Sequence, residues 1–506
     1  MDELIKLTKF LEKYDLKQAD IIGSKHSESR YNEFYTLIKL GTIKSDNEAA
    51  QVFYGKKATG KSQAYRKMKR IFRERLIDTL FFINLNHRDF TEIESATMAI
   101  QKEWAAINII FAKSDTNLAV GLAEELLPKA LKYELTEIVV YITDRLKEGY
   151  GNQIGDIKKY TYYKILQKEQ MLIWQAEIKA KDLFQQLRLE TIRSAADMPH
   201  LAKIAEAGMK DLEHSLSKYK TFRLVSYGYF CKLAQFTASH KYDGALKVID
   251  EAISILEQKP YNAQRVINIF LNQRIVCYMR MKDFEKGKLA ALDVLALQPE
   301  GSIGWFKTLE YFTTIAFQTL NYDEAYTLYR RATENKGVND LVNRNAEIWK
   351  LYKGYLFFFA GEGKIAKVTQ QSPEFKDFKL SKFINDLVIL GKDLEGMRIS
   401  VLIIEAAIQL KEQKFGPLID TVEALTKYRQ RHLAKTHALY RYNLFIKMIG
   451  QLSREGFVRQ SVKRATEVPY REMRKVPIFI DNNGLLTEIV PLEFMWEYIL
   501  SVLKDK

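Results

Sequence analysis

Three short stretches of the sequence share one pattern: Tyr242-Asp243-Gly244-Ala245, Phe284-Glu285-Lys286-Gly287 and Tyr322-Asp323-Glu324-Ala325. Each has an aromatic residue, an acid one place later, and a small residue two places after the acid. The small residues are separated by steps of 42 and 38 residues. A repeat at steps of this length is typical of stacked helical units. The region 226–337 therefore decides the fold.

Apolar residues recur at fixed distances from each small residue. Those that follow it by four and seven places are Ile249, Ala252, Ala291, Val294, Tyr329 and Ala332, and those nine places before it are Phe236, Tyr278 and Ala316. This spacing predicts two helices per unit, each with one apolar stripe. The small residue would let the two helices approach closely. We expect Asp243 or Asp323 to cap the second helix of its unit. One helix pair cannot bury its stripe alone, so the pairs should stack.

The three units resemble tetratricopeptide repeats, and Pro299 lies where such a repeat usually ends. They are longer than the roughly 34 residues of that family. The resemblance implies an all-α fold, a right-handed superhelical solenoid of helix-turn-helix repeats. It also implies a repeat surface that binds a protein or peptide partner.

We expect three regions along the chain: a basic helical N-terminal region at 1–90, the repeat solenoid at 91–465 and a C-terminal cap at 466–506. Helices are expected at 2–14, 28–40, 46–54 and 62–83, with Ser45 and Glu48 forming a capping box. Helix-rich windows at 118–131 and 135–146 predict a divergent pair of the same solenoid. In the cap, Asn483-Gly484 indicates a turn within a short extended segment, and an apolar helix is expected at 492–503.

The composition indicates a folded chain without a membrane span. Of 506 residues, 47% are apolar and 28% are charged, and the net charge is +15. No apolar run approaches the roughly 20 residues of a membrane helix. Only Cys231 and Cys277 are present, too few for a disulfide scaffold, and both are expected to be buried thiols. We expect a cytoplasmic protein whose positive charge can attract an anionic partner.

The stretch Gly55-Lys56-Lys57-Ala58-Thr59-Gly60-Lys61-Ser62 matches the phosphate-binding loop of nucleotide hydrolases letter for letter. In such a loop Lys61 would reach the phosphates and Ser62 would hold magnesium. That loop should follow a buried strand, whereas residues 46–54 predict a helix here. The sequence favours a basic loop between two helices, and nucleotide binding remains the third functional hypothesis.

The helix expected after this loop has a strongly basic outer face. A helix-turn-helix geometry would let its cations neutralise phosphates of a nucleic acid, with Gln63 or Arg66 near base edges. A solvated cationic face explains the same charges without a ligand. The residues that would contact an anion or nucleic acid are Lys56, Lys57, Lys61, Arg66, Lys67, Lys69, Arg70 and Arg73.

A second basic region lies nearer the end of the chain. It comprises Lys427, Arg429, Arg431, His432, Lys435, His437, Arg441, Arg454, Arg459, Lys463 and Arg464. Its tyrosines, Tyr428 and Tyr440, could stack on bases, although charges of this kind more often line an exposed helix.

No catalytic, cofactor-binding or metal-ligating residue is predicted. The seven histidines have no metal-ligand spacing, and no Cys-x-x-Cys motif occurs. The sequence favours a non-enzymatic scaffold or adaptor that binds a protein or peptide. The alternative is a nucleic-acid-binding regulator that uses the basic N-terminal helices.

Overall fold

The computed structural model describes residues 1–14, 30–85, 90–113, 115–193, 198–341, 344–379, 382–383, 395–433, 439–476, 478 and 488–505. Of the described residues, 79% are helical and none lies in a strand. One isolated bridge pairs Val458 with Lys504. The prediction of an all-α chain is confirmed.

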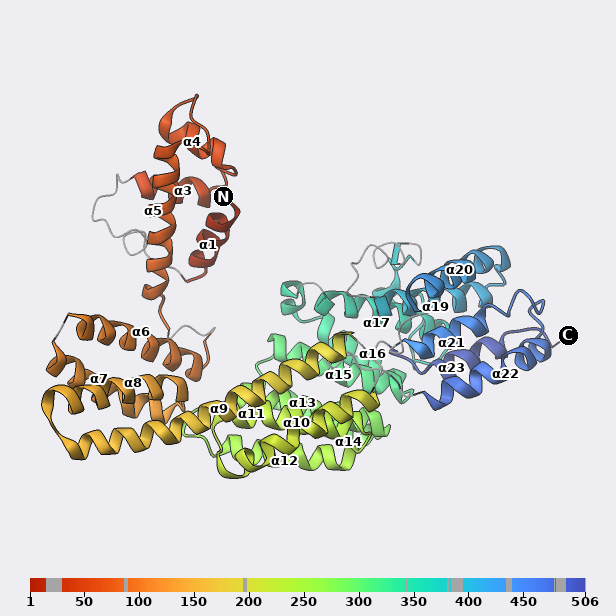
Figure 1. Cartoon of the computed structure of the whole chain (residues 1–506). Helices are drawn as coiled ribbons and strands as arrows, with labels where there is room; N and C mark the ends of the chain where they lie inside the picture. Colours follow the sequence, from red (N-terminus) through yellow and green to blue (C-terminus); the bar gives the residue numbers. More distant parts are fainter. Residues whose placement is uncertain are drawn as a thin grey trace. The chain divides into compact units, whose positions relative to one another are not determined.

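Helices follow one another along the whole chain (Figure 1). They are α1 (Asp2–Glu12), α3 (Arg30–Lys39), α4 (Asp46–Tyr54), α5 (Gln63–Thr79), α6 (Glu92–Ala112), α7 (Thr116–Lys132), α8 (Thr136–Gly149), α9 (Ile157–Arg193), α10 (Met198–Lys218), α11 (Phe222–Ala238), α12 (Tyr242–Glu257), α13 (Gln264–Met281), α14 (Phe284–Ala296), α15 (Ile303–Gln318), α16 (Tyr322–Thr333), α17 (Arg344–Gly361), α19 (Glu395–Lys411), α20 (Phe415–Tyr428), α21 (Tyr440–Ile449), α22 (Arg459–Lys475) and α23 (Leu492–Ser501). Single turns of 3₁₀ helix occur at Leu80–Phe82, Lys336–Asp340 and Pro373–Phe375, and π-helical turns at Tyr150–Ile154 and Arg429–Leu433.

The chain divides into two compact units. The first comprises Met1–Leu172 and Pro260–Asn262, and the second comprises Ile173–Lys259 and Ala263–Lys506.

Four helices of the first unit, α1, α3, α4 and α5, enclose a small core of their own. Phe34 of α3 packs its ring against Phe72 of α5, with 4.7 Å between the ring centroids. Tyr65 and Leu76 of α5 are fully buried beside them. The predicted capping box is present, since Glu48 N–H donates to Ser45 Oγ while Ser45 N–H donates to the Glu48 carboxylate. The helices expected at 2–14, 28–40, 46–54 and 62–83 correspond to these four elements.

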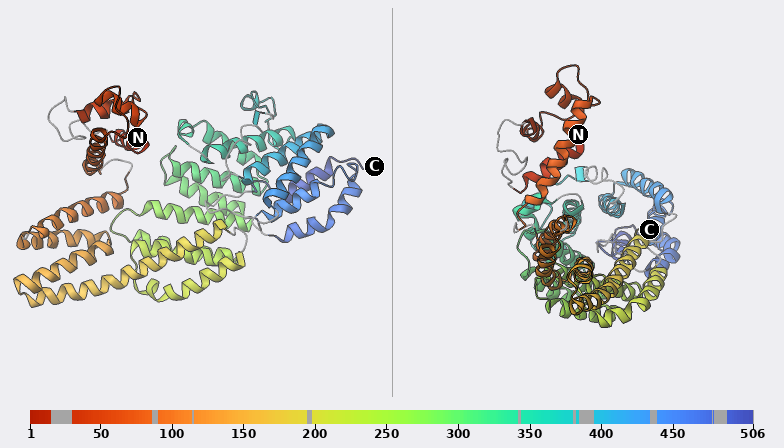
Figure 2. Two further views of the ribbon diagram at one scale, coloured as in Figure 1. Left: turned by 45° about the horizontal axis from the view of Figure 1, so that its top comes forward. Right: turned by 60° about the vertical axis from the view of Figure 1, so that its left-hand side comes forward.

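In the second unit each helix packs mainly against the helices directly before and after it in the sequence. From α11 to α16 each helix packs against the next, and α13 also packs against α15; Figures 1 and 2 show these helices as one stack. In the first unit α7 and α8 form the pair expected at 118–131 and 135–146, and α6 packs on α7.

The three small residues of the repeated pattern lie at helix contacts. Ala245 and Ala325 are fully buried, and Gly287 of α14 is so close to α15 that an added Cβ would lie 2.2 Å from Ile315 Cδ1. The residues four and seven places further on are all buried as well. The predicted register of these helices is therefore confirmed.

The turn between the paired helices differs from the prediction. Asp243 and Asp323 do not cap their helices: the N-cap residues of α12 and α16 are Lys241 and Asn321, and neither side chain makes a capping hydrogen bond. Asp323 instead accepts a hydrogen bond from Ala366 N–H at 2.6 Å. The carboxylate that caps α14 belongs to Asp283, one place before the aromatic residue.

The end of the preceding helix defines this turn. His240, Lys282 and Leu320 have φ angles of 56°, 58° and 63°. The next N–H group donates back to the carbonyl oxygen of Phe236, Tyr278 and Ala316, at 2.9, 3.0 and 2.8 Å. This six-residue hydrogen bond after a left-handed residue is the Schellman helix end. The same geometry occurs at Glu134 and Gln413, before α8 and α20. Five helix pairs therefore share one turn.

The C-terminal helix α23 occupies most of the range expected for the apolar helix of the cap. The Asn483-Gly484 turn lies outside the described residues. Cys231 and Cys277 are buried free thiols, as predicted, and burial raises the pKa of both to about 12.

Candidate binding surfaces

Helix α5 separates its apolar and basic residues onto two faces. Tyr65, Met68, Phe72 and Leu76 are buried, whereas Arg66, Lys67 and Arg70 are exposed. Lys56, Lys57 and Lys61 are exposed in the loop before the helix. Among the described residues, none of Lys56, Lys57, Lys61, Arg66 and Lys67 has a carboxylate partner.

The other three predicted contact residues are held by carboxylates of the same unit. Lys69 Nζ lies 2.7 Å from Asp46 Oδ1, and Arg73 Nε lies 2.8 Å from Glu3 Oε1. Arg70 pairs more loosely with Glu74, at 3.7 Å on the exposed surface. The eight predicted residues therefore divide into five open cations and three that are paired within the fold.

Asp46 joins α4 to α5. Its carboxylate accepts a hydrogen bond from the Tyr65 hydroxyl at 2.5 Å and pairs with Lys69. Although burial raises the pKa of Asp46, the hydrogen bonds from Lys69 and Tyr65 lower it to about 2. The carboxylate is therefore ionised at neutral pH and fixes Lys69 against the helix.

The loop Gly55–Ser62 joins α4 to α5 and is closed by its own hydrogen bonds. Gly60 N–H donates to Asn47 Oδ1 at 2.8 Å, and Thr59 N–H donates to Ser62 Oγ at 3.0 Å. Gly60 also lies so close to α4 that a Cβ there would be 2.8 Å from Asp46 Cβ. A phosphate-binding loop needs its amide groups directed at the ligand. Five of the loop's amide groups, those of Gly55, Ala58, Thr59, Gly60 and Ser62, donate within the fold here.

The second basic region separates into several groups. Lys427, Arg429 and Arg454 line a groove between α20, α21 and α22, and Lys463 and Arg464 are exposed on α22. Arg441 is buried, with 4% of the residue exposed, whereas Arg459 is partly exposed, pairs with Asp505 at 2.6 Å and donates to the carbonyl oxygens of Leu500, Ser501 and Leu503. Lys435, His437 and the side chain of His432 lie outside the described residues.

Arg441 of α21 has an acceptor for each of its five N–H donors. Nε and Nη2 bind the two oxygens of Glu488 at 2.8 and 3.0 Å, and Nη2 also binds Glu493 at 2.8 Å. Nη1 donates to the carbonyl oxygens of Met473 and Val476 at 2.7 and 2.9 Å. Although burial alone would lower the pKa of Arg441, Glu488 and Glu493 raise it. We call the described residues Ile478 and 488–493 the C-terminal segment. The Arg441 guanidinium therefore ties this segment to α21 and to the end of α22.

Two further helices hold the same segment by its main chain. Gln318, at the end of α15, donates to the carbonyl oxygens of Glu488 and Ile489, the latter at 3.0 Å. Arg280, near the end of α13, donates to the carbonyl oxygen of Ile478. Gln318, Glu488 and Ile489 are buried. We call Arg280, Gln318 and Arg441 the segment-binding residues.

Sequence reasoning missed Arg280 and Gln318, but a signal for them exists. Each lies two residues before the left-handed residue that ends its helix, Lys282 or Leu320. A long donor side chain at the same position of successive units becomes visible only when the units are aligned on the turn rather than on the small residue.

A pocket of about 260 Å³ opens beside the segment-binding residues. Its lining includes Arg280, Lys282 and Arg474, and Glu493 is the one acid in it. Glu493 pairs with Arg441, which also lines the pocket. Arg280, Lys282 and Arg474 therefore have no carboxylate partner among the described residues.

No group of three or more His, Cys, Asp or Glu side chains in the described ranges could hold a metal ion. Of the helices in those ranges, none has both the length and the apolar character to cross a membrane.

Comparison with protein-family models, curated proteins and solved structures gives no match.

Proposed function

We propose that this protein is a cytoplasmic, non-enzymatic scaffold built as a right-handed, tetratricopeptide-like solenoid, and that it binds an extended acidic peptide of a protein partner. The observation that carries the proposal is that Arg280 and Gln318 bind main-chain carbonyl oxygens of Ile478, Glu488 and Ile489 in the chain's own C-terminal region. Recognition through the main chain does not depend on the captured sequence.

The peptide of the partner would enter the pocket beside the segment-binding residues. Three cations, Arg280, Lys282 and Arg474, line that pocket, and Lys282 and Arg474 are exposed. Charge complementarity of this kind selects acidic partners and increases the association rate. The proposal therefore specifies an acidic, extended ligand that lies next to the docked C-terminal segment.

Peptide selection tests this proposal. A library of random peptides displayed on phage is selected against the full chain, and we expect enrichment of peptides rich in Asp and Glu. The double variant Lys282→Glu/Arg474→Glu should weaken binding of the enriched peptides by about tenfold or more, which corresponds to about 1.4 kcal/mol. The matched control is Lys463→Glu/Arg464→Glu, which reverses two exposed charges of α22 outside the pocket.

The proposal fails if no acidic peptide is enriched. It also fails if the enriched peptides bind the pocket variant and the wild type equally well. A folded control that loses binding as strongly as the pocket variant would locate the peptide elsewhere.

A second candidate function is nucleic-acid binding by the first unit. It is supported by the open cations of the α4–α5 region, Lys56, Lys57, Lys61, Arg66 and Lys67. Fluorescence anisotropy with labelled duplex DNA and single-stranded RNA tests it. Reversal of Lys61, Arg66 and Lys67 to Glu should abolish binding, and the affinity of the wild type should fall steeply with salt because counterions are released.

Lys69 and Arg73 make poor targets for that experiment, since Asp46 and Glu3 already neutralise them. Wild-type chain that binds neither nucleic acid at low salt would remove this candidate. We do not propose nucleotide binding by Gly55–Ser62, because five of its amide groups are hydrogen-bonded within the fold.

A further inference from the structure

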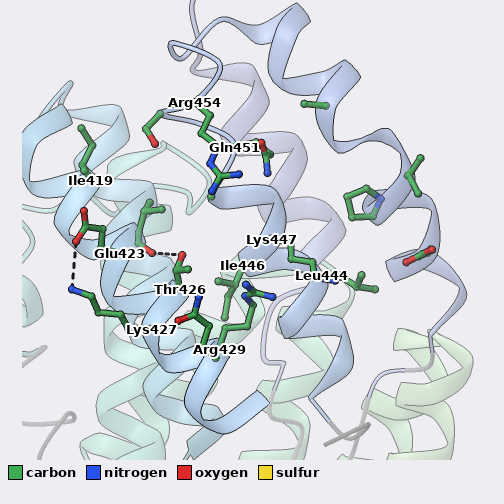
Figure 3. A pocket seen from close by; sticks show the side chains of 18 residues that line it. Ile419, Glu423, Thr426, Lys427, Arg429, Leu444, Ile446, Lys447, Gln451 and Arg454 are labelled. Carbon is green, nitrogen blue, oxygen red and sulfur yellow. Dashed lines mark hydrogen bonds and ion pairs between the residues drawn. The ribbon is translucent and has the colours of Figure 1, made fainter. Parts of the chain in front are cut away.

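A groove of about 770 Å³ lies between α20, α21 and α22 of the second unit (Figure 3). Along α20 it is lined at Ile419, Val422, Glu423, Thr426 and Lys427, which lie on one face of the helix. Its volume is in the range of sites that hold small organic ligands.

The groove carries a net positive charge. Lys427, Arg429, Lys447 and Arg454 line it together with two carboxylates, Glu423 and Glu472. Lys427 and Glu423 pair with each other at 3.5 Å, and both are exposed, so this pair contributes little. Within the described residues, Arg429, Lys447 and Arg454 have no ion pair. Four cations against two carboxylates leave two positive charges for a ligand.

Arg429 supplies a hydrogen-bond donor that the fold does not use. It lies at the start of the π-helical turn Arg429–Leu433, directly after α20. Its Nε is buried, and it has no hydrogen-bond partner in the described part of the chain. A buried donor without an acceptor is costly, so an acceptor from outside the described residues is expected for it. In Figure 3 the side chains of Arg429 and Arg454 extend toward the space that the labelled residues surround.

The groove also offers apolar surface. Ile419 and Val468 line it and are 39% and 56% exposed. Pro469 lies inside α22 and has no N–H group, so the helical hydrogen bond to the Ala465 carbonyl cannot form. Both residues line the groove. A ligand with an apolar body and an anionic group matches this lining better than a bare inorganic ion.

We propose that the α20–α22 groove binds a small organic phosphate. A phosphomonoester carries about −1.5 to −2 charges at neutral pH, which matches the two uncompensated cations. Guanidinium groups bind phosphate oxygens through paired hydrogen bonds, and a phosphate oxygen would accept from Arg429 Nε. The apolar body would contact Ile419 and Val468. This site is separate from the pocket beside the segment-binding residues, so it stands independently of the proposed peptide function.

Isothermal titration calorimetry on the full chain tests the proposal with three matched probes. Phenyl phosphate has the apolar body and the dianion, phenyl sulfate has the same body with one charge, and inorganic phosphate has no body. We expect phenyl phosphate to bind about tenfold more tightly than either of the others, a difference of about 1.4 kcal/mol. No binding of phenyl phosphate at millimolar concentration, or equal binding of all three probes, would overturn the proposal.

Three variants locate the site. Arg429→Gln, Lys447→Gln and Arg454→Gln should each weaken phenyl phosphate binding by about fivefold or more. Lys447 is exposed, so its variant remains informative if Arg429→Gln impairs folding. The control Arg464→Gln removes an exposed arginine of α22 outside the groove and should leave binding unchanged. Unchanged affinity in Lys447→Gln and Arg454→Gln, or tighter binding of a phosphoserine peptide than of phenyl phosphate, contradicts a small-ligand site.

Discussion

Asp46 is a single carboxylate on which the contact between α4 and α5 depends. Because hydrogen bonds and Lys69 lower its pKa from 3.8 to about 2 in the folded chain, its contacts stabilise the fold above pH 3.8. That stability is lost as the pH falls from about 4 toward 2, where the carboxylate takes up a proton. We expect the amide protection factors of α5, which are corrected for the intrinsic exchange rate at each pH, to decrease between pH 5 and pH 2.5.

Asp46→Asn should remove most of this pH dependence, because the amide has no charge to lose. Asp78→Asn is the control, since Asp78 is exposed on α5 and has no ion pair in the described ranges. Equal pH dependence of exchange in the wild type and in Asp46→Asn would contradict the role of Asp46.

Arg441 is the second residue whose removal should have a large effect. Arg441→Met leaves Glu488 buried without its cation, and breaking a buried ion pair in this way costs about 3–5 kcal/mol. Chemical denaturation should show a lower midpoint for this variant. The double variant Arg441→Met/Glu488→Met should recover part of the loss, because no buried charge remains. A single variant as stable as the wild type would show that the five hydrogen bonds do not hold the C-terminal segment.

At the scale of the element, the shared turn makes a testable prediction. Leu320 has a φ of 63° and is 43% exposed. It therefore occupies a left-handed conformation, and its side chain gains little stabilisation from burial. A residue with a Cβ is disfavoured there by about 1–2 kcal/mol, whereas glycine is not. We expect Leu320→Gly to raise the melting temperature despite its more flexible unfolded state.

The control for this turn is Thr327→Gly, at an exposed position inside α16. Glycine in a helix interior should lower stability by about 0.5–1 kcal/mol. If both glycine variants lower the melting temperature equally, the left-handed turn carries no strain.

The small residues of the repeat make a second prediction at this scale. Ala245→Leu and Ala325→Leu insert three carbons at helix contacts that have no free space, and each should cost about 1–3 kcal/mol. Differential scanning calorimetry measures the loss. Gly287→Ala should behave in the same way, because its Cβ would overlap Ile315. Unchanged melting in all three variants would mean that these contacts relax without strain.

These elements show what the pattern could and could not reveal. The spacing of apolar and small residues located the buried faces, because the apolar face of a helix repeats every three to four residues. It placed the caps at Asp243 and Asp323, where the structure has none. The turn is instead determined by backbone geometry at His240, Lys282 and Leu320, and three such different side chains give no common signal.

At the scale of the whole molecule, we expect a far-ultraviolet circular dichroism spectrum dominated by helix, in keeping with a structure that is 79% helical. A substantial strand component would contradict the fold.

Charge pairing was less predictable from the sequence than helix content. Composition gave +15 but could not separate open cations such as Arg66 from paired ones such as Lys69, since pairing depends on residues distant in sequence. Arg441 looked like a surface cation for the same reason.

The position of Glu488 also has a consequence for synthesis. Its partner Arg441 precedes it by 47 residues, so a ribosome working at roughly 5–20 residues per second completes the pair only several seconds after α21 has emerged. Until then Arg441 and Gln318 belong to a nascent chain whose interior donors have no acceptors. Helix stacking can proceed in order from the N-terminal side, but the last helices cannot close before the C-terminal segment leaves the ribosomal exit tunnel. Completion of the fold therefore waits for the C-terminal segment, and this is the interval in which a chaperone would find the chain open.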